Sequence, residues 1–183
     1  MKENRRIQMT KMLLRESLFE LLEEKPIGKI TIKEICENAD INRSTFYKYY
    51  GDQFVLLKEV EDELMQKTAE FVFNLNAEDN KLTILEDFLG YVKKNADIFR
   101  ILFSANGNTH FRYKLYNIVM QRLSAENYAV DADDDIRFVL GIVIMGSISG
   151  IEEWVNSDCN KPIKTLAILM YNLITYGLTG LHK

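Results

Sequence analysis

Hydrophobic and polar residues alternate with helical spacing along most of this 183-residue chain. The first helix is predicted by a repeat of apolar residues every three to four positions, namely Ile7, Leu14, Leu18, Leu21 and Leu22. The repeat stops at Lys25-Pro26, where a proline ends a helical pattern. No segment shows the period-two alternation that is typical of strands, and the chain contains only 2 prolines, so an all-α fold is expected.

A capping box, Thr31-Ile32-Lys33-Glu34, predicts the start of a second helix over residues 32 to about 39. In such a box the Thr31 hydroxyl accepts a hydrogen bond from the Glu34 N–H, and the Glu34 carboxylate accepts one from the Thr31 N–H. The sequence Asp40-Ile41-Asn42 predicts a tight turn, because aspartate tolerates left-handed backbone angles and Asn42 is a favourable N-cap. A third helix is therefore expected from Arg43 to about residue 50.

Longer helices are expected after this region. Gly51-Asp52 ends the third helix and caps a long one that continues to about Asn76. Further helices are predicted over residues 82–94, 96–104, 111 to about 127, 134–156 and 162 to about 181. Residues 138–145 are apolar on every face, which predicts burial on one side against the same domain and on the other against a partner subunit.

Charge is distributed unevenly along the chain, whose net charge is −4. Residues 1–58 carry 11 basic and 9 acidic side chains, whereas the remaining residues carry 12 basic and 18 acidic ones. This asymmetry favours one part that can approach phosphate and one that cannot. Cys36 and Cys159 form no CxxC motif and only 2 histidines are present, so no disulfide framework, metal site or other cofactor is expected.

Targeting and membrane signals are not expected in this sequence. The first 19 residues contain no apolar segment of the kind found in secretory signals, and the apolar run 138–145 is shorter than the roughly 18 residues of a membrane span. We therefore predict a cytoplasmic protein with no membrane partner.

Two short helices that are joined by a tight turn and preceded by a longer helix form the layout of a helix-turn-helix DNA reader. The second short helix would enter the major groove of double-stranded DNA, and residues 41–50 contain no carboxylate that would repel phosphate. Ile41 and Phe46 are expected to pack inward. The residues expected to contact DNA are Asn42, Arg43, Ser44, Thr45, Tyr47, Lys48 and Tyr49.

Residues 31–50, TIKEICENADINRSTFYKYY, followed by FVLL at 54–57, resemble the DNA-binding domain of TetR-family transcriptional regulators. The resemblance extends over about residues 5–57. It implies that Thr31 touches phosphate and that Tyr47, Tyr49 and Tyr50 sit on the DNA backbone. Gln53 stands where a phosphate-contacting lysine is usual, which implies a weaker or lost contact, and Asp40 stands where glycine is usual.

The resemblance also implies an organisation for the whole chain. A DNA-binding domain with three helices would span residues 1–51, and a helical ligand-binding and dimerisation domain would span residues 52–183. The expected function is that of a homodimeric repressor, which binds a near-palindromic operator and is released by an unidentified small-molecule inducer.

Candidate residues in the second domain each have an ordinary structural explanation beside the functional one. Ligand-binding candidates, each of which core packing explains better than ligand contact when it is taken singly, are Phe88, Tyr91, Phe103, Tyr113, Tyr116, Phe138 and Met145. The glycines near residue 146 cost helix propensity, about 1 kcal/mol each relative to alanine, and predict close helix packing either between subunits or within one. The dimer-interface candidates are Gly146, Ser149, Gly150, Trp154, Tyr171 and Ile174.

The sequence argues against one other class of function and leaves a second one open. No nucleophile–base pair, metal-ligand set or phosphate-binding loop occurs, so the chain is not expected to be an enzyme. A co-regulator or small-molecule-binding interaction module that has lost operator reading stays open. The acidic second part and Gln53 are the features that favour this alternative.

Overall fold

The computed structural model describes residues 2–74, 81–106, 110–125 and 134–176, and these residues form helices and turns without any strand. The helices are, in order, α1 (Lys2–Glu24), η1 (Ile27–Lys29), α2 (Ile32–Asn38), α3 (Arg43–Phe46), α4 (Gln53–Asn74), α5 (Lys81–Lys94), α6 (Ala96–Phe103), α7 (Phe111–Ala125), α8 (Asp134–Asn156) and α9 (Ile163–Tyr176). The all-α prediction is confirmed. The predicted helix ends at residues 76, 127 and 181 lie outside the described residues.

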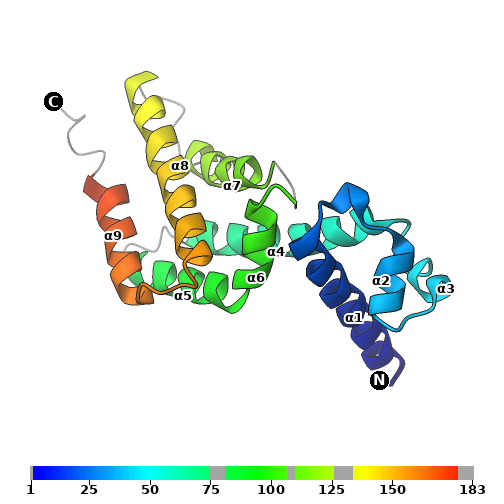
Figure 1. The fold of residues 1–183 in the computed structure, drawn as a ribbon. Coiled ribbons are helices and arrows are strands. Elements are labelled where there is room, and N and C mark those ends of the chain that lie inside the picture. Colours follow the sequence, from blue (N-terminus) through cyan, green and yellow to red (C-terminus); the bar gives the residue numbers. More distant parts are fainter. Residues whose placement is uncertain (1, 75–80, 107–109, 126–133, 177–183) are drawn as a thin grey trace.

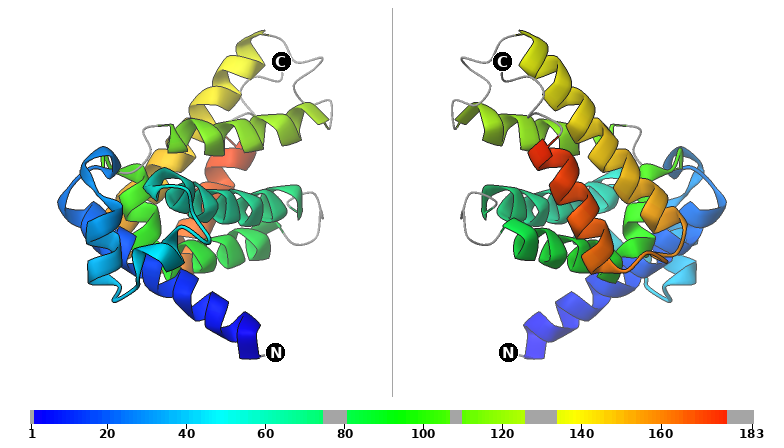
Figure 2. Two further views of the ribbon diagram at one scale, coloured as in Figure 1. Left: turned by 90° about the vertical axis from the view of Figure 1, so that its right-hand side faces the viewer. Right: turned by 90° about the vertical axis from the view of Figure 1, so that its left-hand side faces the viewer.

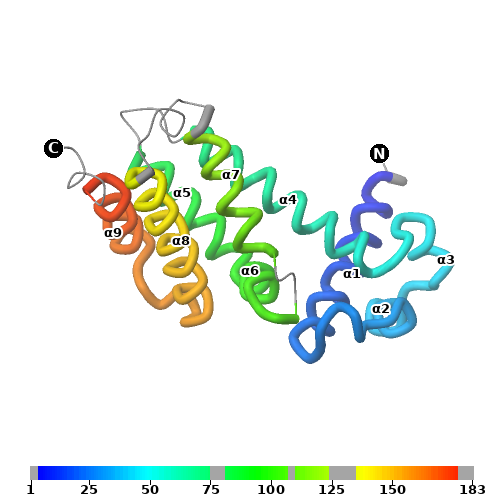
Figure 3. The backbone as a smooth tube through the Cα atoms, turned by 90° about the horizontal axis from the view of Figure 1, so that it is seen from above, coloured from blue at the N-terminus to red at the C-terminus, as the bar shows by residue number. Residues whose placement is uncertain are grey.

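The molecule is elongated, with two groups of helices at opposite ends (Figure 1). We call α1, η1, α2 and α3 the head, and α5 to α9 the body. Helix α4 begins beside the head and runs into the body, as the view from above makes clear (Figure 3). It packs against α1 at one end and against α5 and α7 at the other. The position of the head therefore depends on α4.

Local sequence signals in the head form as predicted. The Glu34 N–H donates a 3.3 Å hydrogen bond to Thr31 Oγ1, and the Thr31 N–H donates a 2.9 Å bond to Glu34 Oε2, which completes the capping box. Asp40 adopts the expected left-handed conformation with φ 52°. Asn42 caps α3, because its side chain accepts a 2.9 Å hydrogen bond from the Ser44 N–H.

The third helix is shorter than the sequence indicated. Helix α3 ends at Phe46 rather than at about residue 50. The N–H groups of Lys48 and Tyr49 donate to carbonyls three residues back, at 3.3 and 2.9 Å, so the chain tightens into turns. The Tyr50 N–H returns to a four-residue spacing, with a 2.9 Å bond to the Phe46 carbonyl.

A continuous apolar core joins the head to the body. In the head, Leu14 and Leu18 of α1 and Phe46 of α3 are fully buried. In the body, Leu89, Leu102 and other apolar side chains are equally inaccessible. Burial of this apolar surface, at roughly 25 cal/mol per Å², supplies most of the free energy that folds the chain.

Helix α8 carries an exposed apolar face. By length and composition alone, residues 135–156 could cross a membrane, which the shorter run 138–145 did not indicate. Only 39% of the most apolar 18-residue stretch of this helix is buried within the chain. Exposed apolar side chains of α8 are Phe138 and Ile142, at 72% and 57%. A helix at the interface between two subunits has the same pattern.

Candidate nucleic-acid interface

Residues 42–50, which we call the recognition segment, expose most of the side chains expected to contact DNA. Thr31 at the start of α2 is also exposed. The exposed residues of the segment are Asn42, Arg43, Ser44, Tyr47 and Lys48, whereas Thr45 and Tyr49 are half-buried. Tyr47 is 59% exposed. The described geometry therefore leaves both cations and the Tyr47 ring accessible to a negatively charged surface.

The Thr31 hydroxyl is already engaged within the capping box. It donates a 2.8 Å hydrogen bond to Glu34 Oε2, while Lys25 Nζ lies 2.5 Å from Glu34 Oε1. Hydrogen bonds from Lys25 and Thr31 lower the pKa of Glu34 to about 2, so the carboxylate is charged at neutral pH. A phosphate contact by the Thr31 hydroxyl would require that O–H to turn away from Glu34.

The inner face of the recognition segment anchors it to the head. Phe46 is fully buried and Tyr50 is 2% exposed, with their ring centroids 5.6 Å apart. Ile41 is partly buried against the same core. The inward packing of Ile41 and Phe46 is as predicted, whereas Tyr50, which the family resemblance associated with the DNA backbone, points into the protein.

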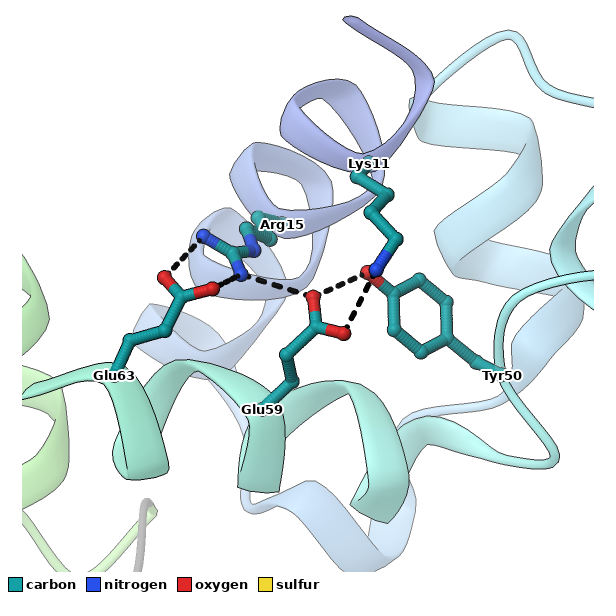
Figure 4. Close-up of polar contacts among 5 residues, drawn as sticks. All are labelled: Lys11, Arg15, Tyr50, Glu59 and Glu63. Atoms are coloured by element: carbon teal, nitrogen blue, oxygen red, sulfur yellow. Dashed lines mark hydrogen bonds and ion pairs between the residues drawn. The ribbon is translucent and has the colours of Figure 1, made fainter. Parts of the chain in front are cut away.

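A network of polar side chains fixes α1 and the end of the recognition segment to α4 (Figure 4). Glu59 on α4 accepts hydrogen bonds from Lys11 at 2.9 Å, from Arg15 at 2.9 Å and from the Tyr50 hydroxyl at 2.8 Å. Arg15 also donates a 2.8 Å bond to Glu63 one turn further along. The contacts from α1 join residues 44 and 48 positions apart, so they define where the head lies on α4.

The electrostatics of this network favour its charged form. Burial opposes the charged state of Glu59, but hydrogen bonds from Lys11, Tyr50 and Arg15 outweigh that effect and lower its pKa. The hydrogen bond to Glu63 raises the pKa of Arg15, despite opposing desolvation. Burial and then the bond to Glu59 raise the pKa of Tyr50. The sequence showed these residue types, but nothing in their local spacing indicated the network.

The predicted ligand residues separate into two groups. Aromatic rings from α4, α5, α6 and α7 form one cluster, in which the centroids of neighbouring rings lie 5.1 to 6.3 Å apart. Its members are Phe71, Phe88, Tyr91, Phe99, Phe103 and Phe111. Phe88, Tyr91 and Phe103 of this cluster are among the predicted ligand residues. Tyr113 and Phe138 are 63% and 72% exposed and lie outside this cluster. Tyr116 and Met145 are half-buried. Gly141 of α8 packs against Tyr116, because a Cβ atom placed on Gly141 would lie 3.6 Å from the Tyr116 hydroxyl oxygen.

Buried polar groups lie on the face of α4 that includes Glu61 and Thr68. Glu61 is 2% exposed and forms an ion pair with Lys114 of α7. Thr68 is 3% exposed, and its hydroxyl has no hydrogen-bond partner among the described residues. The sequence analysis missed both residues. Their burial could have been inferred from the sequence, because Glu61 and Thr68 lie on the same helix face as the apolar residues Val60 and Leu64, and the opposite face is charged.

The predicted dimer residues also occupy two environments. Gly146, Ser149 and Gly150 are exposed, and a Cβ added at either glycine would meet nothing within 4 Å. On α9, Ile174 is 40% exposed and Tyr171 is half-buried. Trp154 is 3% exposed and donates from Nε1 to the Lys161 carbonyl at 2.9 Å, so it belongs to the subunit core and not to the exposed face. Helices α8 and α9 lie side by side on the end of the body away from the head (Figure 2).

Comparison with known proteins identifies relatives across the whole chain. Residues 79–176 match the family model TetR_C_8, described as a transcriptional regulator C-terminal region. An uncharacterized HTH-type transcriptional regulator of Bacillus subtilis (strain 168), YxbF, is 25% identical over 169 residues, which cover 88% of this chain. The chain spans 44% of the length of that relative.

Solved structures share the fold. A TetR transcriptional regulator from Streptococcus agalactiae 2603V is 25% identical, with a TM-score of 0.62 over 100% of this chain and 99% of that one. The regulator FadR from Bacillus subtilis, in complex with stearoyl-CoA, is 17% identical, with a TM-score of 0.60 over 91% of this chain and 98% of that one. The second likeness concerns the fold alone. The family match covers more than half of the chain, which is therefore a member of the TetR family of transcriptional regulators.

Proposed function

We propose that the chain is a homodimeric repressor that binds a near-palindromic DNA operator and is released by a small-molecule ligand. The observation that carries this proposal is the recognition segment, whose outer side chains are exposed and uncharged or cationic while its inner face is locked to α4. A helix-turn-helix reader requires this combination, because contacts to base edges need a fixed orientation.

The DNA contacts are assigned to the residues predicted from sequence. Arg43 is the candidate for base reading, since its guanidinium can bind guanine through two hydrogen bonds in the major groove. Lys48 and Tyr47 are also exposed and would contact the phosphate backbone. The remaining candidates are Thr31, Asn42, Ser44, Thr45 and Tyr49.

Dimerisation is assigned to the exposed face of α8 and α9. On α8 this face combines Phe138 and Ile142 with the small residues Gly146, Ser149 and Gly150, which allow a second helix to approach closely. On α9 the exposed apolar side chains are Ile168, Leu169, Leu173, Ile174 and Tyr176. Two heads held by such a dimer would read successive major grooves, about 34–36 Å apart or a multiple of that distance.

The ligand site is assigned to the aromatic cluster of the body. Phe88, Tyr91 and Phe103 from the predicted set belong to it, and Phe71 connects α4 to it. The rings favour a flat or apolar ligand, in keeping with the acyl-CoA bound by the structurally similar FadR. Glu61 and the Thr68 hydroxyl would supply polar contacts. Ligand binding would favour a dimer whose heads are separated wrongly for the operator. The size of this shift equals the difference between the affinities of the ligand for that dimer and for the DNA-binding dimer.

The division of the chain is proposed to follow the start of α4. Residues 1–51 would form the DNA-binding domain and residues 52–183 the ligand-binding and dimerisation domain. Arg15 of α1 donates hydrogen bonds to Glu59 and Glu63 of α4, which would join the two parts. A cytoplasmic location is proposed, since operator DNA is found there in bacteria.

The first test is a selection of bound sequences from random duplex DNA with the purified chain, followed by salt titration of the enriched sequence. We expect a near-palindrome and a steep fall of affinity with salt, because each phosphate contact releases counterions. Addition of acyl-CoA esters and flat aromatic compounds would then identify ligands that release the DNA. Failure to enrich any sequence would contradict the proposal and favour the co-regulator alternative.

A further inference from the structure

The connection between α6 and α7 makes direct hydrogen bonds to the head. The side-chain Nδ2 of Asn106 donates a 3.1 Å bond to the Leu22 carbonyl near the end of α1. The backbone carbonyl of Asn106 accepts a 3.2 Å bond from the Ile27 N–H, at the start of η1. Figure 3 shows the end of α6 reaching this corner of the head. Asn106 therefore binds both sides of the corner between α1 and η1.

The two bonds satisfy backbone groups that the head leaves open. Leu22 is one of the last four residues of α1, whose carbonyls lack an N–H partner in the next helical turn. Its side chain is 1% exposed, so its carbonyl lies close to the core. A buried polar group without a partner destabilises the folded chain, so the hydrogen bond from Asn106 to this carbonyl contributes to stability.

The same connection is tied to the body from its other side. The Asn106 N–H donates a 3.2 Å bond to Ser104 Oγ, which in turn donates a 2.7 Å bond to the Ile101 carbonyl of α6. Arg112 at the start of α7 donates to the Phe103 carbonyl at 3.0 Å. Residues 103–106, the coupling segment, are thus fixed to α6 and α7.

Arg112 extends this chain of contacts to α8. Its Nε donates a 2.8 Å hydrogen bond to Glu152 Oε2, and its Nη2 pairs with the other Glu152 oxygen. Glu152 lies on α8, which also carries the proposed dimer face. Hydrogen bonds from Glu152 through Arg112 to Phe103, the backbone of the coupling segment and the Asn106 bonds to α1 and η1 therefore lead from α8 to the head.

Beside the apolar core, hydrogen bonds among the described residues consequently attach the head at two separate places. Glu59 and Glu63 hold it on α4, and Asn106 holds it on the body. Attachment along one helix leaves rotation about that helix as the least restrained motion. A second attachment, where α1 ends beside η1, restrains this rotation, which would change the orientation of the recognition segment relative to the body.

We propose that Asn106 is the positioning residue that sets the orientation of the head relative to the body, and through it the spacing of the two recognition segments. This inference rests on the proposed dimeric function and assigns a specific residue to its regulation. A single neutral hydrogen bond changes an equilibrium by about two- to tenfold, so a ligand that shifts the coupling segment needs only modest differential affinity to release it.

The test compares Asn106→Ala with Asn38→Ala, which removes a 2.7 Å side-chain bond to Glu20 inside the head. Affinity is measured for the selected operator and for versions with one base pair added to or removed from the spacer. We expect Asn106→Ala to reduce the preference for the correct spacer by about two- to tenfold and Asn38→Ala to leave it unchanged. An unchanged preference in Asn106→Ala would overturn the proposal.

Hydrogen exchange of the Ile27 amide supplies a readout that needs no DNA. Its acceptor is the Asn106 backbone carbonyl, which every variant keeps, so exchange reports how firmly the side-chain bond to Leu22 holds the coupling segment against η1. We expect exchange to accelerate by about two- to tenfold in Asn106→Ala and to stay at the wild-type rate in Asn38→Ala. Asn106→Asp replaces the donor with an acceptor facing the Leu22 carbonyl, so it should exchange at least as fast and serves if the alanine variant folds poorly. If the wild type selects no operator, the proposed function fails, and unchanged exchange in both Asn106 variants would separately overturn the role of Asn106.

Discussion

The Tyr50 hydroxyl donates a 2.8 Å hydrogen bond to Glu59 Oε1, which joins the end of the recognition segment to α4. The Tyr50 ring is at the same time buried against Phe46. One residue thus fixes the segment both to the core of the head and to the helix that leads into the body. The orientation of the DNA-reading surface depends on this pair.

Tyr50→Phe is expected to lower the free energy of unfolding by about 1.5–3 kcal/mol, because it removes a hydrogen bond to the charged Glu59 carboxylate and keeps the buried ring. Urea denaturation followed by circular dichroism measures this change. Tyr47→Phe is the matched control. Tyr47 is 59% exposed, so removal of its hydroxyl should leave the free energy of unfolding almost unchanged. Equal losses in the two variants would show that the bond to Glu59 contributes nothing specific.

Arg43→Ala is expected to weaken operator binding by about 1–3 kcal/mol, the usual contribution of an arginine that reads a guanine. Folding should be unaffected, because Arg43 is exposed. Tyr47→Ala should weaken binding as well. Fluorescence anisotropy with labelled operator measures both, and Lys67→Ala, an exposed cation on the distal half of α4, is the control. Wild-type affinity in both head variants would place the DNA contacts elsewhere.

Gly146→Leu is expected to convert the dimer to monomers, because a leucine would overpack a face on which another helix must approach closely. Within one chain, an added Cβ at Gly146 meets nothing within 4 Å, so the fold itself should tolerate the change. Gly90→Leu on α5, which has equally open surroundings, is the control. Analytical ultracentrifugation reports the mass, and an unchanged dimer in Gly146→Leu would move the interface away from this part of α8.

Gln53→Lys is expected to tighten DNA binding at low salt by adding a phosphate contact. Gln53 is the first residue of α4 and is half-buried beside the recognition segment. The slope of log affinity against log salt concentration should become steeper by about 0.9, the value for one additional phosphate. A salt titration of both proteins on the same operator tests this, and parallel slopes would exclude the contact.

The capping box is expected to lose its contribution to stability in acid. The pKa of Glu34 is about 2 in the folded chain against an ordinary value of 4.5, chiefly through its hydrogen bond from Lys25. Stability from the charged carboxylate is therefore fully present above pH 4.5 and is lost as the pH falls toward 2. The difference in unfolding free energy between wild type and Glu34→Gln should shrink over this range. A difference independent of pH would contradict the role of the charge.

Local signals in the head were readable from sequence because their partners are only a few residues apart. Thr31 and Glu34 form their box across three positions, and Asn42 caps α3 through an N–H two residues on. The shorter α3 was not predictable in this way, since the three-residue bonds of the Lys48 and Tyr49 N–H groups that replace the helix after Phe46 follow no local sequence signal. The left-handed backbone of Asp158 and Cys159 likewise follows no glycine signal.

The sequence alone determined that the chain is helical and where most helices begin, and it identified the outer residues of the recognition segment. These properties depend on periodicity, capping and residue type, which act over one or two helical turns. Only the tertiary structure decided that Trp154 lies inside the subunit, that Glu61 is buried, and that Asn106 contacts Leu22 across 84 positions. Contacts of that kind arise when distant helices pack together, and no local pattern encodes which side chains will then meet.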